Sequence, residues 1–129
     1  MNKSQLSIIR QRLRQLCVQR TQCEQIALGT SSLTRATLLE RTFRPNQREP
    51  YYYLSCSAGG VSRHRYVPRR EAELWRRRTD EWRRFSQAVA RWVKLHREIE
   101  HLLRAIGRER CVPVPRLSDS APGKSSSSR

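Results

Sequence analysis

Residues 50–70, PYYYLSCSAGGVSRHRYVPRR, contain all four tyrosines of the chain, its only Gly-Gly pair and four arginines. Two runs of residues that favour β-structure, 51–55 and 61–67, flank the glycines. A two-residue turn at Ala58-Gly59 or at Gly59-Gly60 would pair these runs as antiparallel strands. This stretch therefore predicts a β-hairpin in the middle of the chain.

Either turn gives the same facing, because side chains alternate between the two faces of a strand. One face of the predicted hairpin then holds Tyr51, Tyr53, His64 and Tyr66. The other face holds Tyr52, Leu54, Arg63, Arg65 and Val67. A turn of three residues would exchange the two faces.

Outside the hairpin, apolar residues recur at helical spacings. In residues 4–28 they step by three and four, with Arg20 as the one polar break, and Gly29 follows where a helix would stop. A longer helix is expected from near Arg69 to Gly107, with a seam made of Trp75, Arg78, Trp82, Phe85, Val89, Trp92, His96, Ile99, Leu103 and Ile106. Residues 37–43 favour a third strand, because Thr37 and Thr42 are β-branched.

These elements predict an α+β fold. A heptad-patterned antiparallel helical hairpin carries a small three-stranded antiparallel sheet inserted between its helices. We expect a single domain over residues 1–111 and a disordered tail over residues 112–129, which are rich in proline and serine. The first helix is too short to cover the whole second helix, so the remainder needs the sheet, a second copy or a partner as its cover.

The composition is strongly basic. In 129 residues, 27 are Lys or Arg and 11 are Asp or Glu, which gives a formal net charge of +16. Arginine supplies nearly all of it, and a guanidinium binds phosphate in a bidentate manner and stacks on bases. Nucleic acid, DNA or RNA, is therefore the predicted partner, and an acidic protein surface is the alternative.

No run of apolar residues is long enough to span a membrane. The N-terminal residues MNKSQLSIIRQRLR lack the apolar region of a signal peptide, so the sequence predicts a cytoplasmic protein.

The four cysteines, Cys17, Cys23, Cys56 and Cys111, form no Cys-x-x-Cys pair. They are expected to be reduced, buried residues, with a zinc site as the weaker alternative.

Enzyme motifs are missing from the sequence. There is no phosphate-binding loop of the G-x-x-x-x-G-K-[ST] type, no G-x-S-x-G and no H-E-x-x-H. The acidic residues of the long helix alternate with arginines, which is typical of solvated ion pairs. We therefore expect no catalytic residues, no metal site and no cofactor, although spacing alone does not exclude a cluster of acids for a two-metal nuclease.

The arginines are the main candidates for a binding site. Along the long helix, Arg69, Arg76 and Arg83 fall seven apart, and Arg70, Arg77 and Arg84 form a second row beside them. Such rows could follow a phosphate backbone, or they could be the solvated face of a coiled coil. In the hairpin, Arg63 and Arg65 are the candidates for anchoring it to phosphates.

The tyrosines allow two interpretations. Tyr51 and Tyr53, with His64 beside them, could contact nucleic acid, either as a ribbon in a major groove or by stacking on single-stranded bases. Alternatively, the tyrosines pack on the helices and form much of the core, as aromatic residues do in small folds.

The order Pro50-Tyr51-Tyr52-Tyr53-Leu54, then Arg63-His64-Arg65-Tyr66-Val67-Pro68, then a long basic helix resembles an uncharacterised family of small prokaryotic proteins often found near transposases. The resemblance covers about residues 4–107 and implies the same helix–sheet–helix order and a setting in mobile DNA. Members of that family carry cysteines in the loop before the tyrosines. Here that loop, residues 43–49, has none, so no metal ligands are implied.

The sequence thus predicts a non-enzymatic accessory protein that binds nucleic acid within a mobile-element or other nucleoprotein assembly. The alternative is a coiled-coil interaction module that docks an acidic protein, a nuclease or a transposase through the long helix. A homodimer through that helix is a further option.

Overall fold

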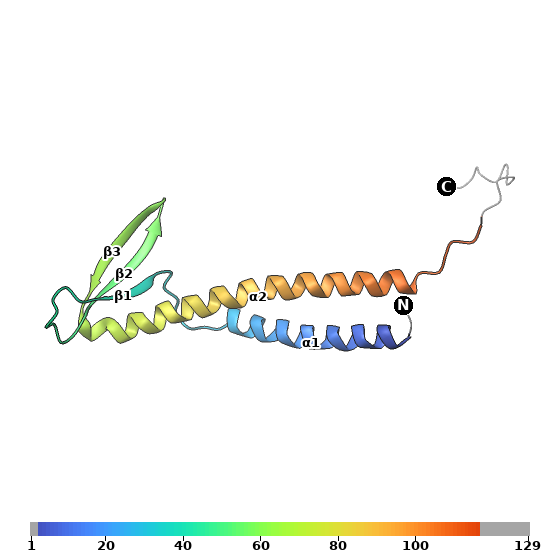
Figure 1. Cartoon of the computed structure of the whole chain (residues 1–129), viewed down its shortest axis with the longest axis horizontal. Helices are drawn as coiled ribbons and strands as arrows, with labels where there is room; N and C mark the ends of the chain where they lie inside the picture. The colour runs from blue at the N-terminus through green and yellow to red at the C-terminus, as the bar shows by residue number, and fades with distance from the viewer. Residues whose placement is uncertain (1–2, 117–129) are drawn as a thin grey trace.

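The computed structural model describes residues 3–116 as two helices with three strands between them (Figure 1). In chain order they are α1 (Lys3–Ala27), β1 (Thr37–Arg41), β2 (Tyr51–Ala58), β3 (Val61–Val67), a 3-10 helix η1 (Arg69–Glu71) and α2 (Ala72–Arg110). The protein is therefore α+β, as the sequence predicts. Of the predicted disordered tail, residues 117–129 lie outside the described part of the chain.

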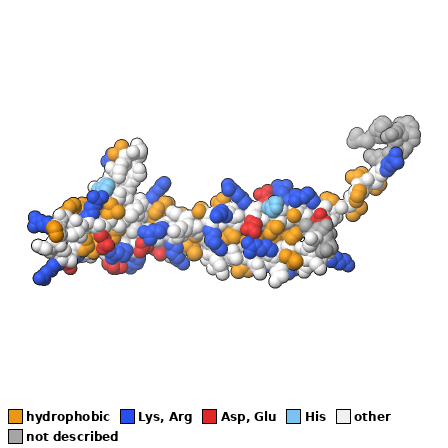
Figure 2. Space-filling model, viewed as in Figure 1, with side chains coloured by type: hydrophobic (Ala, Val, Ile, Leu, Met, Phe, Trp, Pro, Cys, Tyr) orange, Lys and Arg blue, Asp and Glu red, His pale blue; other side chains and the backbone are white. Residues whose placement is uncertain are grey.

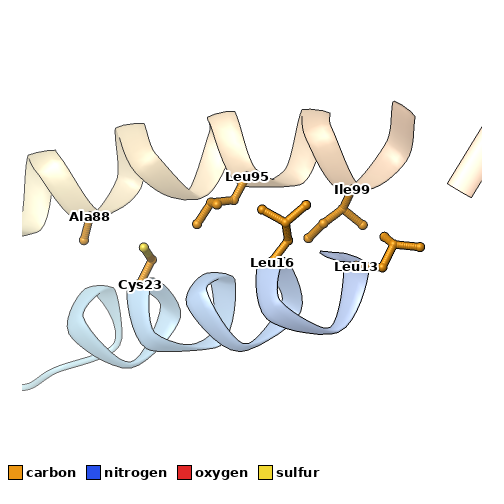
Figure 3. Packing of buried hydrophobic residues seen from close by; sticks show 6 residues of the cluster. All are labelled: Leu13, Leu16, Cys23, Ala88, Leu95 and Ile99. Carbon is orange, nitrogen blue, oxygen red and sulfur yellow. The ribbon is translucent and has the colours of Figure 1, made fainter. Parts of the chain in front are cut away.

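Helix α1 packs antiparallel along the C-terminal half of α2 (Figure 1). Contacts between the helices run in opposite directions along the two sequences: Arg12 pairs with Glu98 at 3.2 Å, and Trp92 Nε1 donates to Glu24 at 2.8 Å. Apolar side chains fill the space between the helices (Figure 3): Leu13, Leu16, Cys23, Ala88, Leu95 and Ile99. Leu16 is fully buried.

The predicted seam of α2 is only partly correct. Ile99 is buried in the contact with α1, but so are Ala88 and Leu95, which the seam omitted, whereas Val89 and Leu103 of the seam are 39% and 55% exposed. A row spaced by seven residues drifts by about 20° per heptad on a helix of 3.6 residues per turn. The seam that starts at Trp75 therefore winds around α2 instead of staying on the side that α1 covers.

Several element boundaries differ from the sequence-based expectation. α1 covers Lys3–Ala27 rather than residues 4–28, and α2 begins at Ala72, after η1, rather than near Arg69. β1 ends at Arg41 rather than residue 43, and β2 continues to Ala58. Helix α2 passes through Gly107 and ends at Arg110, where the Cys111 amide donates to the Gly107 carbonyl. Pro113 lacks an amide hydrogen, so the helix cannot extend far past this point.

The sheet is antiparallel with the strand order β1-β2-β3. Ala58 pairs with Val61, so the turn is Gly59-Gly60, and both glycines have positive φ, 59° and 81°. Turns of this type match the twist of the flanking strands and require positive φ at both central residues. The pairing of Tyr53 with Tyr66 and of Leu54 with Arg65 confirms the predicted facing of the hairpin.

The sheet lies against the N-terminal half of α2, beyond the end of α1, and its β2–β3 hairpin projects away from the helix (Figure 1). Val67, Ala72 and Thr79 are buried there, 2%, 5% and 2% exposed. Thr79 donates its hydroxyl to the Arg76 carbonyl at 3.1 Å, which satisfies the one buried polar side chain of this contact. The sheet is thus one cover for the part of α2 that α1 does not reach.

The cysteines are only partly as expected. All four are free; Cys23 is buried and Cys17 half-buried, but Cys56 and Cys111 are exposed. Cys56 lies on the projecting part of β2 and Cys111 directly follows α2, where little packs against them.

Among residues 3–116, neither helix has the length and apolar character needed to cross a membrane.

Candidate nucleic-acid interface

Four aromatic rings meet on the face of the sheet that points away from α2. Tyr51 and Tyr53 of β2 and Tyr66 of β3 share this face by register, and Phe43 folds onto them from the loop after β1. Ring centroids lie 5.8 Å apart for Tyr53–Tyr66, 6.4 Å for Tyr51–Tyr66 and 5.8 Å for Phe43–Tyr51. We call these four residues the ring face.

The ring face is open to solvent. Phe43, Tyr51 and Tyr66 are 61%, 44% and 52% exposed, and Tyr53 is half-buried among them. The interpretation of the tyrosines as helix-packing core is therefore wrong for three of the four. Only Tyr52 points to α2, where the Arg76 guanidinium lies 5.7 Å from its ring centroid.

The charges around the ring face are positive. Arg41 is the cross-strand partner of Tyr51, and Arg44 and Arg48 follow in the adjoining loop. Glu40 is the only acidic residue of the three strands, and it lies on the other face, 3.5 Å from Arg76. In the loop, Glu49 pairs with Arg69. The carboxylates nearest the rings are thus already paired with arginines.

His64 also lies on this side of the sheet. It is the cross-strand partner of Ser55, one row further toward the hairpin tip than Tyr53 and Tyr66. Its Nε2 lies 3.4 Å from the Ser62 hydroxyl, and the side chain is exposed. The structure therefore brings together three of the predicted site residues: Tyr51, Tyr53 and His64.

Arg63 and Arg65 lie on the opposite face of the hairpin. Their cross-strand partners are Cys56 and Leu54, so they share a face with Tyr52 rather than with the ring face. Both are exposed, and neither forms an ion pair within the described residues. A ligand lying flat on the rings would not reach these two guanidinium groups.

Arg76 is held by the fold itself. It bridges Glu73 at 3.1 Å and Glu40 at 3.5 Å, so it ties β1 to α2. Its hydrogen bond to the Tyr52 side chain is the main cause that raises its pKa above the ordinary value; Glu73 and Glu40 act in the same direction, against desolvation. Of the predicted arginines, this one is the least free to bind a ligand.

The other candidate arginines near the start of α2 form two rows on different sides of the helix. Arg69 and Arg83, in the row of Arg76, pair with Glu49 and with Asp80, the latter at 3.0 Å. The second row consists of Arg70, Arg77 and Arg84, which we call the outer row. Arg77 is two residues from Thr79, which is buried beneath the sheet, so Arg77 points to the other side of α2. Arg70 lies in η1, directly before α2.

The outer row has fewer ion pairs with carboxylates than the row of Arg76. Arg84 is 3.9 Å from Glu81, and no ion pair within residues 3–116 involves Arg70 or Arg77. Arg77 borders a hollow of about 330 Å³ that also includes Ser31, Ser32 and Leu74. Figure 2 shows Lys and Arg along the whole visible surface, with acidic side chains gathered in fewer places.

Phe43 and Arg41 belong to the site, although the sequence-based site omitted both. The strand predicted over residues 37–43 would put Arg41 and Phe43 on one face. Its register, which sets Arg41 opposite Tyr51, comes only from the structure, where Phe43 lies two residues beyond the end of β1. Within residues 3–116, no group of three or more His, Cys, Asp or Glu side chains is arranged to hold a metal ion.

Comparison with known proteins gives no match: no family model, no curated protein and no solved structure is similar to this chain. The resemblance to the transposase-associated family therefore remains an expectation drawn from residues 50–54 and 63–68.

Proposed function

We propose that this chain is a non-enzymatic nucleic-acid-binding protein that contacts phosphates with arginines at its sheet end. The observation that carries the proposal is the surplus of guanidinium groups: the net charge is +16, and Arg63, Arg65, Arg70 and Arg77 form no ion pair within the described residues. Such groups release counterions when they bind a polyanion, which gives a large favourable free energy at moderate salt.

The arrangement of these arginines supports contact from more than one side of the sheet end. Arg63 and Arg65 lie on the projecting hairpin, Arg77 lies on the side of α2 that faces away from the sheet, and Arg70 lies in η1, directly before α2. Phosphate contacts of this kind position a protein on nucleic acid without reading its sequence. This supports a role as an accessory factor in a nucleoprotein assembly, in the cytoplasm, with mobile-element machinery as the setting that the family resemblance implies.

The test is fluorescence anisotropy with a labelled DNA duplex over a salt series, using three double variants. The hairpin pair Arg63→Gln/Arg65→Gln and the helix pair Arg70→Gln/Arg77→Gln should each weaken binding and flatten the plot of log K against log salt, by about 0.9 per lost contact. The control pair Arg108→Gln/Arg110→Gln removes the same charge at the other end of α2.

The proposal expects the control pair to leave affinity and slope close to those of the unchanged chain. Equal losses in all three variants would mean that the whole charged surface attracts the polyanion without a site at the sheet end. Binding by none of the proteins at physiological salt would refute the function itself.

A second candidate function is protein interaction through the helices. It is favoured by Val89 and Leu103, which belong to the predicted seam and remain 39% and 55% exposed on the flank of the α1–α2 pair. A second copy or an adaptor partner would cover this flank. Analytical ultracentrifugation of the chain and of Val89→Ser/Leu103→Ser tests it: a dimer that the variant dissociates supports this function, and a monomer in both cases argues against self-association.

A further inference from the structure

We infer that the ring face stacks on unpaired bases, so that the ligand is single-stranded nucleic acid rather than a duplex. The inference rests on the proposed function and adds the class of substrate. It assigns the recognition of bases to Phe43, Tyr51, Tyr53 and Tyr66, and leaves the phosphates to the arginines.

The first argument is the geometry of the rings. Their contacts are tilted or edge-on: the interplanar angles are 40° for Phe43–Tyr51, 59° for Tyr51–Tyr66 and 73° for Tyr53–Tyr66. Elsewhere in the protein the aromatic pairs are stacked, at 26° for Trp82–Phe85 and 8° for Trp92–His96. The rings on the sheet thus hold one another in place without covering each other face to face.

The second argument is spacing. Tyr51 and Tyr53 are two residues apart on β2, which separates them by about 7 Å along the strand. Phe43 and Tyr66 lie on the two sides of this pair. Sheets that display two or three rings in this manner stack two or three bases in RNA-binding domains. The ring face has the extent to do the same.

The third argument separates unpaired bases from a duplex. In a duplex the flat faces of the bases are covered by their neighbours, and a ribbon in the major groove reads base edges with groups such as Arg, Lys, Asn and Gln. The ring face offers flat aromatic surfaces and one guanidinium, that of Arg41. Every unpaired base has an exposed flat face, so rings bind single strands with little preference for sequence.

The fourth argument is charge, which favours nucleic acid over an apolar protein as the occupant. A protein partner would meet the same rings, but it would also meet Arg41, next to the loop that contains Arg44 and Arg48. The strands place no carboxylate on this face, because Glu40 points to α2. Rings bordered by positive charge fit bases joined by phosphates.

The test measures the binding of four labelled ligands of equal length to the full chain: unpaired oligo-dT, unpaired oligo-U, a DNA duplex and an RNA duplex. We expect both single strands to bind more tightly than either duplex. The variant Tyr51→Leu/Tyr66→Leu should weaken single-strand binding about tenfold or more, because stacking on each ring contributes substantially per base. Since no charge is lost, the salt slope should not change.

Three further variants sharpen the test. Tyr51→Trp/Tyr66→Trp keeps large aromatic faces and should retain single-strand binding. Ile8→Ala/Leu28→Ala removes apolar side chains that are 65% and 80% exposed elsewhere, and should have no effect. Arg41→Gln should lower the single-strand salt slope by about 0.7. Melting curves check that each variant is folded.

A difference between oligo-dT and oligo-U shows whether the chain prefers the DNA strand or the RNA strand, which differ in the sugar and in the 5-methyl group of the base. Equal affinity for single strands and duplexes, unchanged in Tyr51→Leu/Tyr66→Leu, would overturn the inference while leaving phosphate binding by the arginines intact. A chain that binds none of the four ligands at physiological salt would overturn both the inference and the proposed function.

Discussion

The two halves of α2 pack against different partners by different means. The C-terminal half contacts α1 through aliphatic side chains, with Leu16, Leu95 and Ile99 at the centre. The N-terminal half contacts the sheet through fewer apolar groups, together with the buried Thr79 hydroxyl and an arginine between Tyr52, Glu40 and Glu73. The C-terminal half of α2 thus packs as in the core of a helical protein, whereas the N-terminal half is held to the sheet largely by polar contacts.

This difference indicates that one end of the protein supplies most of the stability and the other end carries the proposed binding groups. Burial of aliphatic surface is the dominant favourable term in folding, so the α1–α2 half is expected to carry most of the stability. The sheet half leaves Phe43, Tyr51 and Tyr66 exposed and Tyr53 half-buried, and it holds arginines on several sides. The proposed binding groups are therefore gathered where the packing is thinner.

Leu16→Ala should have the largest effect on stability. Leu16 is fully buried between the helices, and replacing a buried leucine by alanine costs about 2–5 kcal/mol. Urea unfolding followed by circular dichroism measures the loss. Leu28→Ala, at a position 80% exposed, is the matched control and should change the free energy of unfolding by less than about 0.5 kcal/mol. Similar losses in both would show that the α1–α2 contact is not the main core.

Replacing glycine by alanine should change the stability of the protein in opposite directions at Gly60 and Gly107. Gly60 has φ +81° in the hairpin turn, so Gly60→Ala should destabilise the protein by about 1 kcal/mol or more. Gly107 lies within α2, and a Cβ there would meet nothing within 4 Å, so Gly107→Ala should stabilise by about 0.5–1 kcal/mol. Thermal unfolding of both variants tests the pair. A stabilising Gly60→Ala would contradict the turn geometry.

Arg76→Gln should loosen the sheet more than the helices. It removes the contacts with Tyr52 of β2 and Glu40 of β1 that hold these strands to α2. Hydrogen exchange should become faster in the strands and stay unchanged in α1. Arg83→Gln is the control, because its pair with Asp80 is three residues away on the same helix. If exchange in the strands is equal in the two variants, Arg76 does not fasten the sheet.

The smallest effect is expected at the pair of Glu100 and Arg104, which are 2.8 Å apart. Arg104 lowers the pKa of Glu100, first by hydrogen bonding and then by its charge. Because the pKa is lowered in the folded state, the pair contributes stability above the ordinary glutamate pKa and loses it as pH falls through the lowered value. In Arg104→Gln the Glu100 pKa, followed by NMR, should return toward its ordinary range, with little change in melting temperature. An unchanged Glu100 pKa in this variant would contradict the interaction between Glu100 and Arg104.

Much of the fold is readable from the sequence because local rules and packing agree there. The glycines between two β-rich runs limited a two-residue turn to Ala58-Gly59 or Gly59-Gly60, and either turn puts the same residues on one face; the structure has the second. The seam of α2 was harder to predict, because its two halves meet α1 and the sheet on different sides of one helix. A single repeat of seven residues cannot describe both contacts.

The site was less predictable than the fold. Alternation placed Tyr51, Tyr53 and His64 together, but it did not tell which face of the sheet α2 covers. That depends on long-range contacts such as the one between Tyr52 and Arg76. For the same reason, the sequence did not show which helix arginines are paired, whereas the structure separates Arg76, which is tied to carboxylates, from Arg70 and Arg77.

The most direct test of the account is photo-crosslinking of the full chain to an oligonucleotide that carries bromouracil, with the crosslinked residues identified by mass spectrometry. Stacking on the ring face predicts crosslinks at Phe43, Tyr51, Tyr53 and Tyr66, and their loss in Tyr51→Leu/Tyr66→Leu. Crosslinks confined to α1 or to the C-terminal half of α2 would contradict the account, because bases would then bind away from the sheet.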